Sequence, residues 1–189
     1  MAREGGAKAK KNLYFLRECG RIKKKKGESE MKRIMFVCHG NICRSPMAEM
    51  LFKKMIADAH LQGRIEAFSS AVSSEEIYRG VGNPIYPPAR AELKRRGVPV
   101  LEHRAVQLKR EDYPLYDLFL CMDESNLWGM HRIFGGDPEC KCKKLLDLTP
   151  QGGEVADPWY TGGFGKAFED IEKGCRALLE VLKTDKKAE

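Results

Sequence analysis

Apolar strand-like segments alternate with helical segments from Met31 onward, and this alternation restricts the possible fold more than any other feature. The strand-like segments are residues 31–38, 64–70, 116–122 and 143–148. The helical segments are one that ends at Gly63 and those at 87–97, 124–134 and 164–183, with Asp123 as a cap. Strands separated by helices predict a single α/β domain with a parallel sheet and right-handed crossovers.

The loop at residues 38–45 follows the first predicted strand and is rich in reactive and charged side chains. In parallel sheets, ligands bind at the carboxyl ends of strands, where the first loop meets its helix. We expect Ser45 to cap that helix and Pro46 to lie in its first turn, so that free amides and the helix dipole face the loop. Gly40 would help the loop amides form an anion nest, and Arg44 offers a fork for two phosphate oxygens. The loop therefore predicts a phosphate-binding site.

Cys38 begins the loop, in a Cys-x5-Arg-Ser pattern with Arg44 and Ser45. A helix N-terminus and a nearby cation lower the pKa of a cysteine. The groups that hold a phosphate would therefore also keep Cys38 as a thiolate able to attack phosphorus. The alternative is a buried structural cysteine beside a surface arginine.

Hydrolysis of a phosphate monoester also needs a proton donor for the leaving oxygen. The only acid near the loop is Glu49, inside the predicted helix, so we favour Asp157 in "VADPWYTGG", residues 155–163. A proline follows Asp157 and holds it extended, and nearby glycines allow its loop to fold over a site. Trp159 and Tyr160 would line an aromatic slot. The alternative is an ordinary Asp-Pro turn.

The formal net charge of +7 is concentrated at the N-terminus. Residues 1–30 hold ten Lys and Arg against four Glu, whereas the remaining residues hold 24 Lys and Arg against 23 Asp and Glu. We expect residues 1–30 to be a basic, disordered leader, and the native protein could start at Met31. The body lacks the overall positive charge that nucleic acid binding needs.

Several features of the whole chain predict a cytoplasmic protein. No apolar run approaches the ~20 residues of a membrane span, and "NLYFL" at 12–16 lacks a signal-peptide cleavage site. Seven cysteines without a framework spacing suit a reducing compartment, and the chain's size suits a monomer. Cys140 and Cys142 with His131 are a weak metal signal, because no second cysteine pair matches them. We expect exposed loop cysteines there, and neither a metal nor another cofactor.

Together these segments resemble the low-molecular-weight protein tyrosine phosphatases over almost all of residues 31–183. "VCHGNICRSPMAE" is similar to the signature loop of that family, "VADPWY" to its acid loop, and "CMDESN" (121–126) to the segment that ends its fourth strand. The resemblance implies a flavodoxin-like, doubly wound, four-stranded parallel sheet with helices on both faces, in one domain at 31–185. It also implies metal-free hydrolysis of a phosphotyrosine protein or a small aryl phosphate through a cysteinyl-phosphate.

The family's site residues can be carried over only by motif. Cys38 would be the nucleophile and Arg44 would stabilise the phosphoryl group. Asp157 would protonate the phenolic oxygen and then activate water. The residues of the loop and its supports are His39, Gly40, Asn41, Ile42, Cys43, Ser45, Ser69 and His103. Asn41 and Ser45 would brace the loop and hydrogen-bond the thiolate, with Ser69 and His103 as outer partners.

The resemblance further implies that Cys43 can form a reversible disulfide with Cys38, which would make the enzyme redox-sensitive. The alternative is a small loop side chain without a redox role. His39, Val106 and Trp159 depart from the family pattern. The resemblance therefore indicates the type of reaction more directly than it indicates the substrate.

Three other functions remain open from the sequence. A protein-arginine phosphatase on the same scaffold tends to have threonine where Ile42 stands, and isoleucine favours an aryl phosphate. A thiol-linked arsenate reductase needs a resolving cysteine pair on a mobile segment, which Cys121, Cys140 and Cys142 fit poorly. A non-catalytic phosphate-binding module would leave Cys38 and Asp157 without a role.

Overall fold

The computed structural model describes residues 31–184. The predicted leader at 1–30 lies outside these residues, so the leader, the start at Met31 and the domain boundary at 185 stay predictions. The described residues form one α/β domain in which four parallel strands lie in the order β2-β1-β5-β6. The strands are β1 Lys32–Cys38, β2 Ile65–Ala71, β5 Leu118–Cys121 and β6 Cys142–Lys144.

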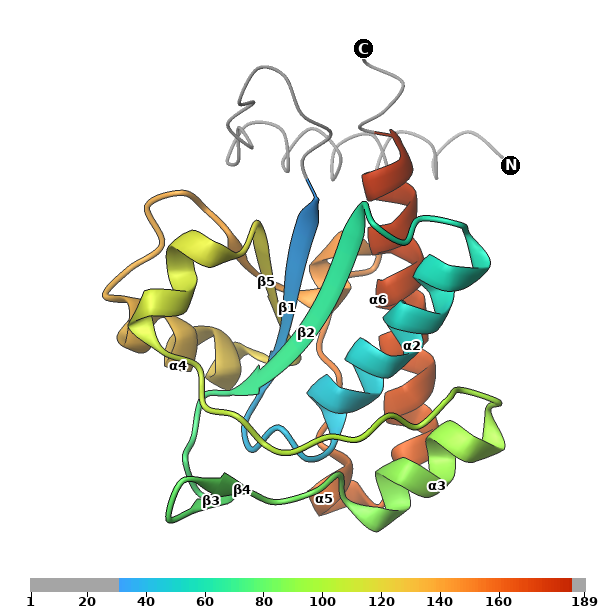
Figure 1. Cartoon of the computed structure of the whole chain (residues 1–189), viewed down its shortest axis with the longest axis horizontal. Coiled ribbons are helices and arrows are strands. Elements are labelled where there is room, and N and C mark those ends of the chain that lie inside the picture. The colour runs from blue at the N-terminus through green and yellow to red at the C-terminus, as the bar shows by residue number, and fades with distance from the viewer. Residues whose placement is uncertain (1–30, 185–189) are drawn as a thin grey trace.

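Helices cover both faces of this sheet, as Figure 1 shows. On one face lie α2 Arg44–Asp58, α3 Pro87–Arg95 and α6 Phe164–Thr184. On the other face lies α4 Glu124–Phe134, preceded by a 3₁₀ turn, η1 Arg110–Leu115. The prediction of a doubly wound, four-stranded parallel sheet is therefore confirmed.

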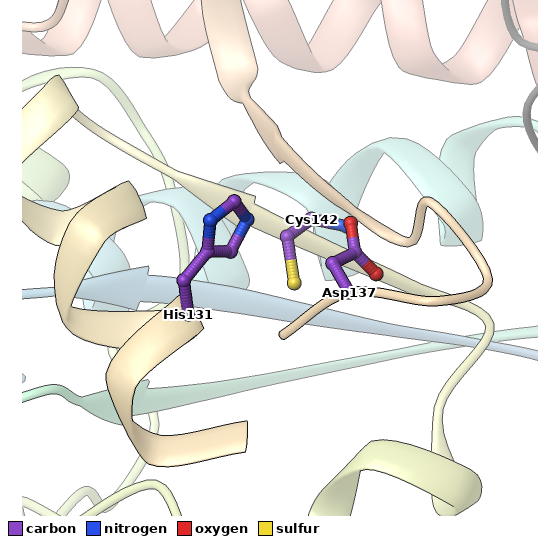
Figure 2. A group of neighbouring side chains, drawn as sticks. All are labelled: His131, Asp137 and Cys142. Atoms are coloured by element: carbon purple, nitrogen blue, oxygen red, sulfur yellow. The ribbon is translucent and has the colours of Figure 1, made fainter. Parts of the chain in front are cut away.

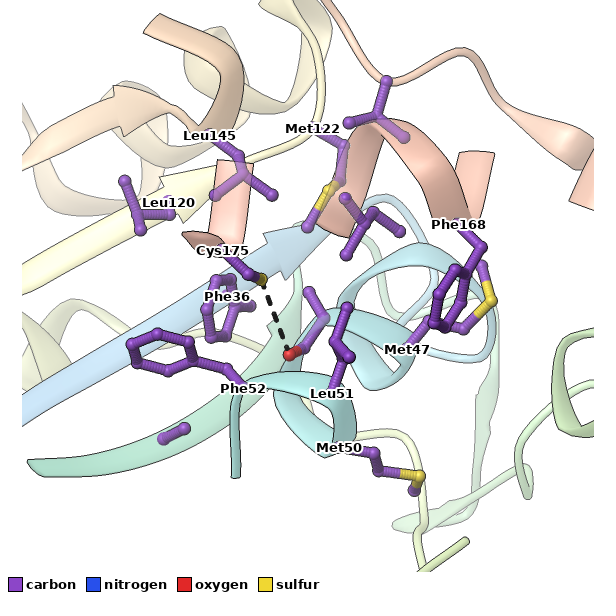
Figure 3. Close-up of a cluster of buried hydrophobic side chains, with 14 of the residues drawn as sticks. Phe36, Met47, Met50, Leu51, Phe52, Leu120, Met122, Leu145, Phe168 and Cys175 are labelled. Carbon is purple, nitrogen blue, oxygen red and sulfur yellow. Dashed lines mark hydrogen bonds between the residues drawn. The ribbon is translucent and has the colours of Figure 1, made fainter. Parts of the chain in front are cut away.

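The alternation of side chains along β1 explains the two layers. Ile34 and Phe36 lie in the larger core under α2 and α6, whereas Met35 and Val37 lie in the smaller core under α4. Figure 3 shows the larger core, where the rings of Phe36 and Phe52 meet edge to face at 5.7 Å between centroids. A central strand that is apolar on both faces can be buried only between two layers.

The predicted strand at 143–148 is wrong in its second half. The chain leaves the sheet after Lys144 and forms a 3₁₀ turn, η2 Leu145–Leu148. Asp147 stabilises this turn because its carboxylate accepts a hydrogen bond from the Lys144 backbone N–H at 3.2 Å. Leu145 packs against α6 at Gly174, where an added Cβ would lie 2.4 Å from the leucine Cγ. The apolar run therefore fills a contact with a helix, not a further length of strand.

The boundaries of the first helix also differ from the prediction. α2 begins at Arg44 with Cys43 at its N-cap, and no side chain caps it. The prediction that Ser45 is the cap is wrong, because Ser45 lies inside the helix and its hydroxyl contacts Cys38. Pro46 lies in the first turn as predicted, but the helix ends at Asp58, before Gly63.

The later helices agree more closely with the sequence. Asp123 caps α4 as predicted, since its carboxylate accepts from the Asn126 backbone N–H at 2.8 Å. The segment expected to be a loop after β2 contains a short hairpin, β3 Ile77–Tyr78 and β4 Val81–Gly82. A single turn of helix, α5 Pro158–Thr161, follows Asp157. No helix in residues 31–184 has the length and apolar character needed to cross a membrane.

Candidate active site

Cys38 is the last residue of β1, and its sulfur lies inside the loop at residues 38–45. The residue is buried, with 3% of its surface exposed. The Asn41 backbone N–H donates to Cys38 Sγ at 3.3 Å, and Ser45 Oγ lies 3.0 Å from the same sulfur. Donors aimed at one sulfur stabilise its thiolate. The loop therefore holds Cys38 in a setting suited to a nucleophile.

Asn41 organises the loop through all of its polar groups. Its φ of 56° is left-handed, a conformation that few residues other than glycine adopt. The side-chain Nδ2 donates to Ser45 Oγ and to Ser69 Oγ, each at 2.9 Å. The side-chain oxygen accepts from the Val106 backbone N–H at 2.9 Å, and His103 Nε2 lies 2.8 Å from the backbone carbonyl oxygen. These bonds hold the unfavourable backbone conformation in place.

This network also orients the hydroxyl of Ser45. Because Asn41 Nδ2 donates to Ser45 Oγ, the hydroxyl proton of Ser45 is left for another acceptor. Cys38 Sγ lies 3.0 Å away, and the Ser70 carbonyl lies at 3.4 Å. Ser69 in turn donates to Glu49 Oε2 at 2.5 Å. The chain of bonds therefore runs from Glu49 in α2 to the sulfur of Cys38.

Arg44 joins the loop to two distant segments. Its Nη1 donates to Asp123 Oδ2 at 2.6 Å and to the Val155 carbonyl at 2.9 Å. Its Nη2 donates to Asp157 Oδ2 at 2.7 Å. Burial tends to lower the pKa of Arg44, but the negative charges of Cys38, Asp157 and Asp123 outweigh burial and raise that pKa. The guanidinium therefore keeps its charge inside the site.

Asp157 lies beside Arg44 and is the N-cap of α5. Its Oδ1 accepts from the Trp159 backbone N–H at 3.0 Å, while Oδ2 accepts from Arg44. Its backbone is extended, as the following proline predicts, and its side chain is 24% exposed. The fold thus brings the predicted acid, 113 residues along the chain, to the arginine of the loop.

The predicted aromatic slot has one unforeseen member. The ring of Trp159 contacts Tyr86, with 4.9 Å between ring centroids. The backbone N–H of Tyr86 donates to the Ile42 carbonyl at 2.8 Å, which fixes Tyr86 to the loop. Tyr160 is 86% exposed, so its place in a slot stays a prediction.

The remaining residues of the loop differ in exposure. His39 is exposed, with Nε2 2.8 Å from Glu75 Oε2. An added Cβ on Gly40 would lie 2.9 Å from Glu76 Cγ, so the loop is closely packed there. Ile42 is half-buried against the larger core, and Cys43 is buried.

Burial raises the pKa of Cys43 to about 12, and the nearby Cys38 and Asp157 add to this effect. Cys43 is therefore a neutral thiol at ordinary pH.

Asp123 and Tyr86 are the site residues that the sequence did not reveal. Asp123 was expected only to cap a helix, although it lies two residues after β5, a buried strand whose neighbour in the sheet ends at Cys38. The carboxyl ends of adjacent parallel strands meet at one edge, and that rule could have placed Asp123 in the site. Tyr86 gave no such signal. Figure 1 shows the β3–β4 hairpin and α5 gathered at the same end of the sheet as the loop after β1.

Comparison with known proteins identifies the family. Residues 33–188 match the family model described as low molecular weight phosphotyrosine protein phosphatase. A protein of that name from Pongo abelii is 39% identical over 158 residues, which covers 81% of this chain and 97% of the relative.

Solved structures agree with the sequence comparison. The crystal structure of YfkJ from Bacillus subtilis has a TM-score of 0.79 and 33% identity, over 85% of this chain and 99% of that one. A mutant of the YwlE arginine phosphatase with a phosphorylated active-site serine has a TM-score of 0.68 and 29% identity, over 83% and 99% of the two chains. The chain belongs to the low-molecular-weight phosphotyrosine protein phosphatase family, a family of hydrolases.

Proposed function

We propose that the protein hydrolyses phosphotyrosine in two steps, through a phosphate bound covalently to Cys38. One observation carries this proposal: Arg44 Nη2 donates to Asp157 at 2.7 Å, while the next residue, Ser45, contacts the sulfur of Cys38 at 3.0 Å. The groups that would serve as nucleophile, phosphate-binding cation and proton donor are thus linked by direct contacts. A non-catalytic phosphate-binding module would leave Cys38 and Asp157 without a role.

Arg44 is suited to bind the phosphoryl group because part of its guanidinium is unused. Both Nη1 protons and one Nη2 proton are bonded to Asp123, Val155 and Asp157. Among the described residues, the other Nη2 proton and the Nε proton have no acceptor. These two donors would be available to phosphoryl oxygens, and they would stabilise the charge that develops as Cys38 attacks phosphorus.

Asp157 would act as the acid in the first step. The protonated Asp157 carboxyl gives its proton to the phenolic oxygen as the P–O bond breaks. In the second step the carboxylate removes a proton from water, which attacks phosphorus and releases the Cys38 thiolate. Ser45 stabilises this leaving thiolate through its hydroxyl.

The aromatic pair of Trp159 and Tyr86 favours an aryl phosphate as substrate. The second candidate substrate is phosphoarginine, because the YwlE arginine phosphatase has the same fold. Ile42 disfavours it, since an isoleucine side chain has no polar group to contact a guanidinium. An arsenate reductase is disfavoured because Cys121 is buried in β5 and is not on a mobile segment. Relative kcat/KM for phosphotyrosine, phosphoarginine and phosphoserine peptides separates these functions.

Four finer points belong to the same proposal. The substrate would be a phosphotyrosine protein or a small aryl phosphate, and the enzyme would act as a monomer in the cytoplasm. Cys43 would protect Cys38 by forming a disulfide after oxidation, since the two lie on one short loop. The mass of a peptide that contains both cysteines, measured after peroxide treatment, shows whether the disulfide has formed and so tests this role.

The experiment that tests the mechanism is to trap the covalent intermediate. Rapid quenching during turnover should leave phosphate on Cys38, located by mass. Cys38→Ser should abolish turnover of p-nitrophenyl phosphate and retain phosphate binding. Orthovanadate should inhibit, whereas chelators should leave turnover unchanged because no step needs a metal. Phosphate on another residue, or turnover by Cys38→Ser, would overturn the mechanism.

A further inference from the structure

Three potential metal-binding side chains lie together on the face of the sheet opposite α2 and α6. They are His131 in the last turn of α4, Asp137 in the loop after it, and Cys142 at the start of β6. One ligand atom from each lies within 4.8 Å of the others. Figure 2 shows the imidazole, the carboxylate and the sulfur facing a common space. None of them takes part in the mechanism above.

His131 Nε2 has no explanation as an ordinary structural group. This atom is buried and has no hydrogen-bond partner within residues 31–184. Buried polar atoms almost always have a partner, so an orphaned ring nitrogen next to a thiol and a carboxylate calls for a ligand. The imidazole nitrogen is also the commonest metal ligand among side chains.

Asp137 is already held in a fixed orientation. Its Oδ1 accepts from the Tyr113 hydroxyl at 2.6 Å and from the Lys141 backbone N–H at 2.8 Å. Its Oδ2 accepts from the Cys142 backbone N–H at 2.9 Å, which leaves one lone pair on that oxygen. Ligating carboxylates are typically fixed by such outer hydrogen bonds.

Cys142 differs from the sequence expectation. We expected an exposed loop cysteine, but Cys142 is only 8% exposed, because it starts β6 and packs in the smaller core. The thiol therefore lies in the space that it shares with His131 and Asp137 and is largely shielded from solvent.

We propose that His131, Asp137 and Cys142 bind one Zn²⁺ ion, with solvent in the fourth position. A nitrogen, a carboxylate oxygen and a thiolate suit zinc, whereas magnesium and calcium prefer oxygen ligands alone. Zinc bonds of about 2.0–2.3 Å place tetrahedral ligand atoms roughly 3.3–3.8 Å apart. Small changes in side-chain torsion angles, which move each ligand atom by a distance on the order of 1 Å, would bring the three atoms to that spacing. The thiol proton is released to solvent as the Zn–S bond forms.

The zinc site would stabilise the fold and would not take part in phosphate chemistry. It joins the end of α4 to the edge strand β6, whereas Asp123, at the start of α4, contacts Arg44. His131 and Asp123 are eight residues apart, or about 12 Å along the helix. Zinc should therefore raise the unfolding temperature without changing turnover.

The test is a titration with Co²⁺, which reports thiolate ligation by an absorption band in the near ultraviolet. The full chain should carry Cys19→Ser and Cys38→Ser, so that neither of those thiols competes. We expect one Co²⁺ per chain with the band, displacement of Co²⁺ by Zn²⁺, and a higher unfolding temperature with Zn²⁺. Cys142→Ser should lose the band, and His131→Gln should weaken binding at least tenfold.

Two matched variants control for general effects. His60→Gln changes an exposed histidine, and Cys175→Ala changes a buried cysteine in the other core. Both should bind Co²⁺ like the parent chain. Circular dichroism shows whether each variant is folded. If the parent chain gives no band, or if Cys142→Ser and His131→Gln bind like the parent, the zinc site does not exist.

Discussion

Asp123→Asn tests most directly whether a fixed Arg44 is needed for catalysis. Asp123 makes two contacts: Oδ1 accepts from the Asn126 backbone N–H at 2.8 Å, and Oδ2 accepts from Arg44 Nη1 at 2.6 Å. Asn is as good an N-cap residue as Asp. The substitution therefore keeps the cap of α4, but it places an NH₂ group where Oδ2 accepts from Arg44, so both the negative charge and that hydrogen bond are lost. Asp123 would be a positioning residue, because it acts through Arg44.

The structure gives the size of the expected effect. A hydrogen bond to a charged group contributes about 1.5–3 kcal/mol. The Arg44 side chain is 3% exposed but that of Asp123 is 20% exposed, so screening by solvent places the loss near the lower end of that range. About 1.36 kcal/mol corresponds to a tenfold change in rate. We therefore expect kcat/KM to fall about 10- to 30-fold.

The assay is hydrolysis of p-nitrophenyl phosphate, measured beside the unfolding temperature of each variant. Asp58→Asn is the matched control, because it also removes an aspartate from an ion pair, here with Lys54, but the Asp58 side chain is 63% exposed and lies outside the site. The control should keep kcat/KM within twofold. Asp123→Ala should lower the unfolding temperature as well, because it also removes the cap. If Asp123→Asn keeps parental kcat/KM, the contact with Arg44 does not serve catalysis.

Three other predictions concern leaving group, pH and packing. Asp157→Ala should lower kcat about 10²- to 10⁴-fold for phenyl phosphate and much less for p-nitrophenyl phosphate, whose leaving oxygen barely needs a proton. Cys43→Ala should flatten the loss of stability above pH 9, because burial raises the pKa of this thiol from 9.0 to about 12. Gly174→Ala should destabilise the fold by about 1–3 kcal/mol through its clash with Leu145, whereas Gly165→Ala in the same helix should not.

The sign of the pH effect follows from proton binding. Between pH 9 and 12 the folded chain keeps the Cys43 proton, whereas the unfolded chain releases it, so stability falls as the pH rises. The loss is about 1 kcal/mol at pH 10, and urea unfolding at pH 8 and pH 10 measures it. Equal pH slopes for Cys43→Ala and the parent chain would contradict the raised pKa.

The other two predictions have equally direct tests. Equal losses of kcat on the two substrates would remove Asp157 from the role of acid. For Gly174→Ala, the free energy of unfolding should fall although alanine favours helices more than glycine does. A gain in stability would show that the contact between α6 and η2 is loose.

Local pattern alone determined much of this protein. The spacing of apolar residues predicted the four parallel strands and the longer helices in their order along the chain, because burial of one or two faces sets the period of apolar residues. It did not predict the end of β6, the β3–β4 hairpin or α5. The sequence also indicated that Cys38 and Arg44 belong to one site, because both lie in the same short loop and their chemistry depends on residues that are close in sequence. The family follows from the same segments.

Tertiary structure decided the contacts between distant segments. Asp123 and Asp157 reach Arg44 across 79 and 113 residues, and only the order of strands in the sheet brings them to one edge. Tertiary packing also places Leu145 in η2 and not in the sheet. It brings His131, near the end of α4, close to Cys142 in the edge strand β6. Such contacts leave no period in the sequence, because each depends on where a whole element lies and not on its own residues.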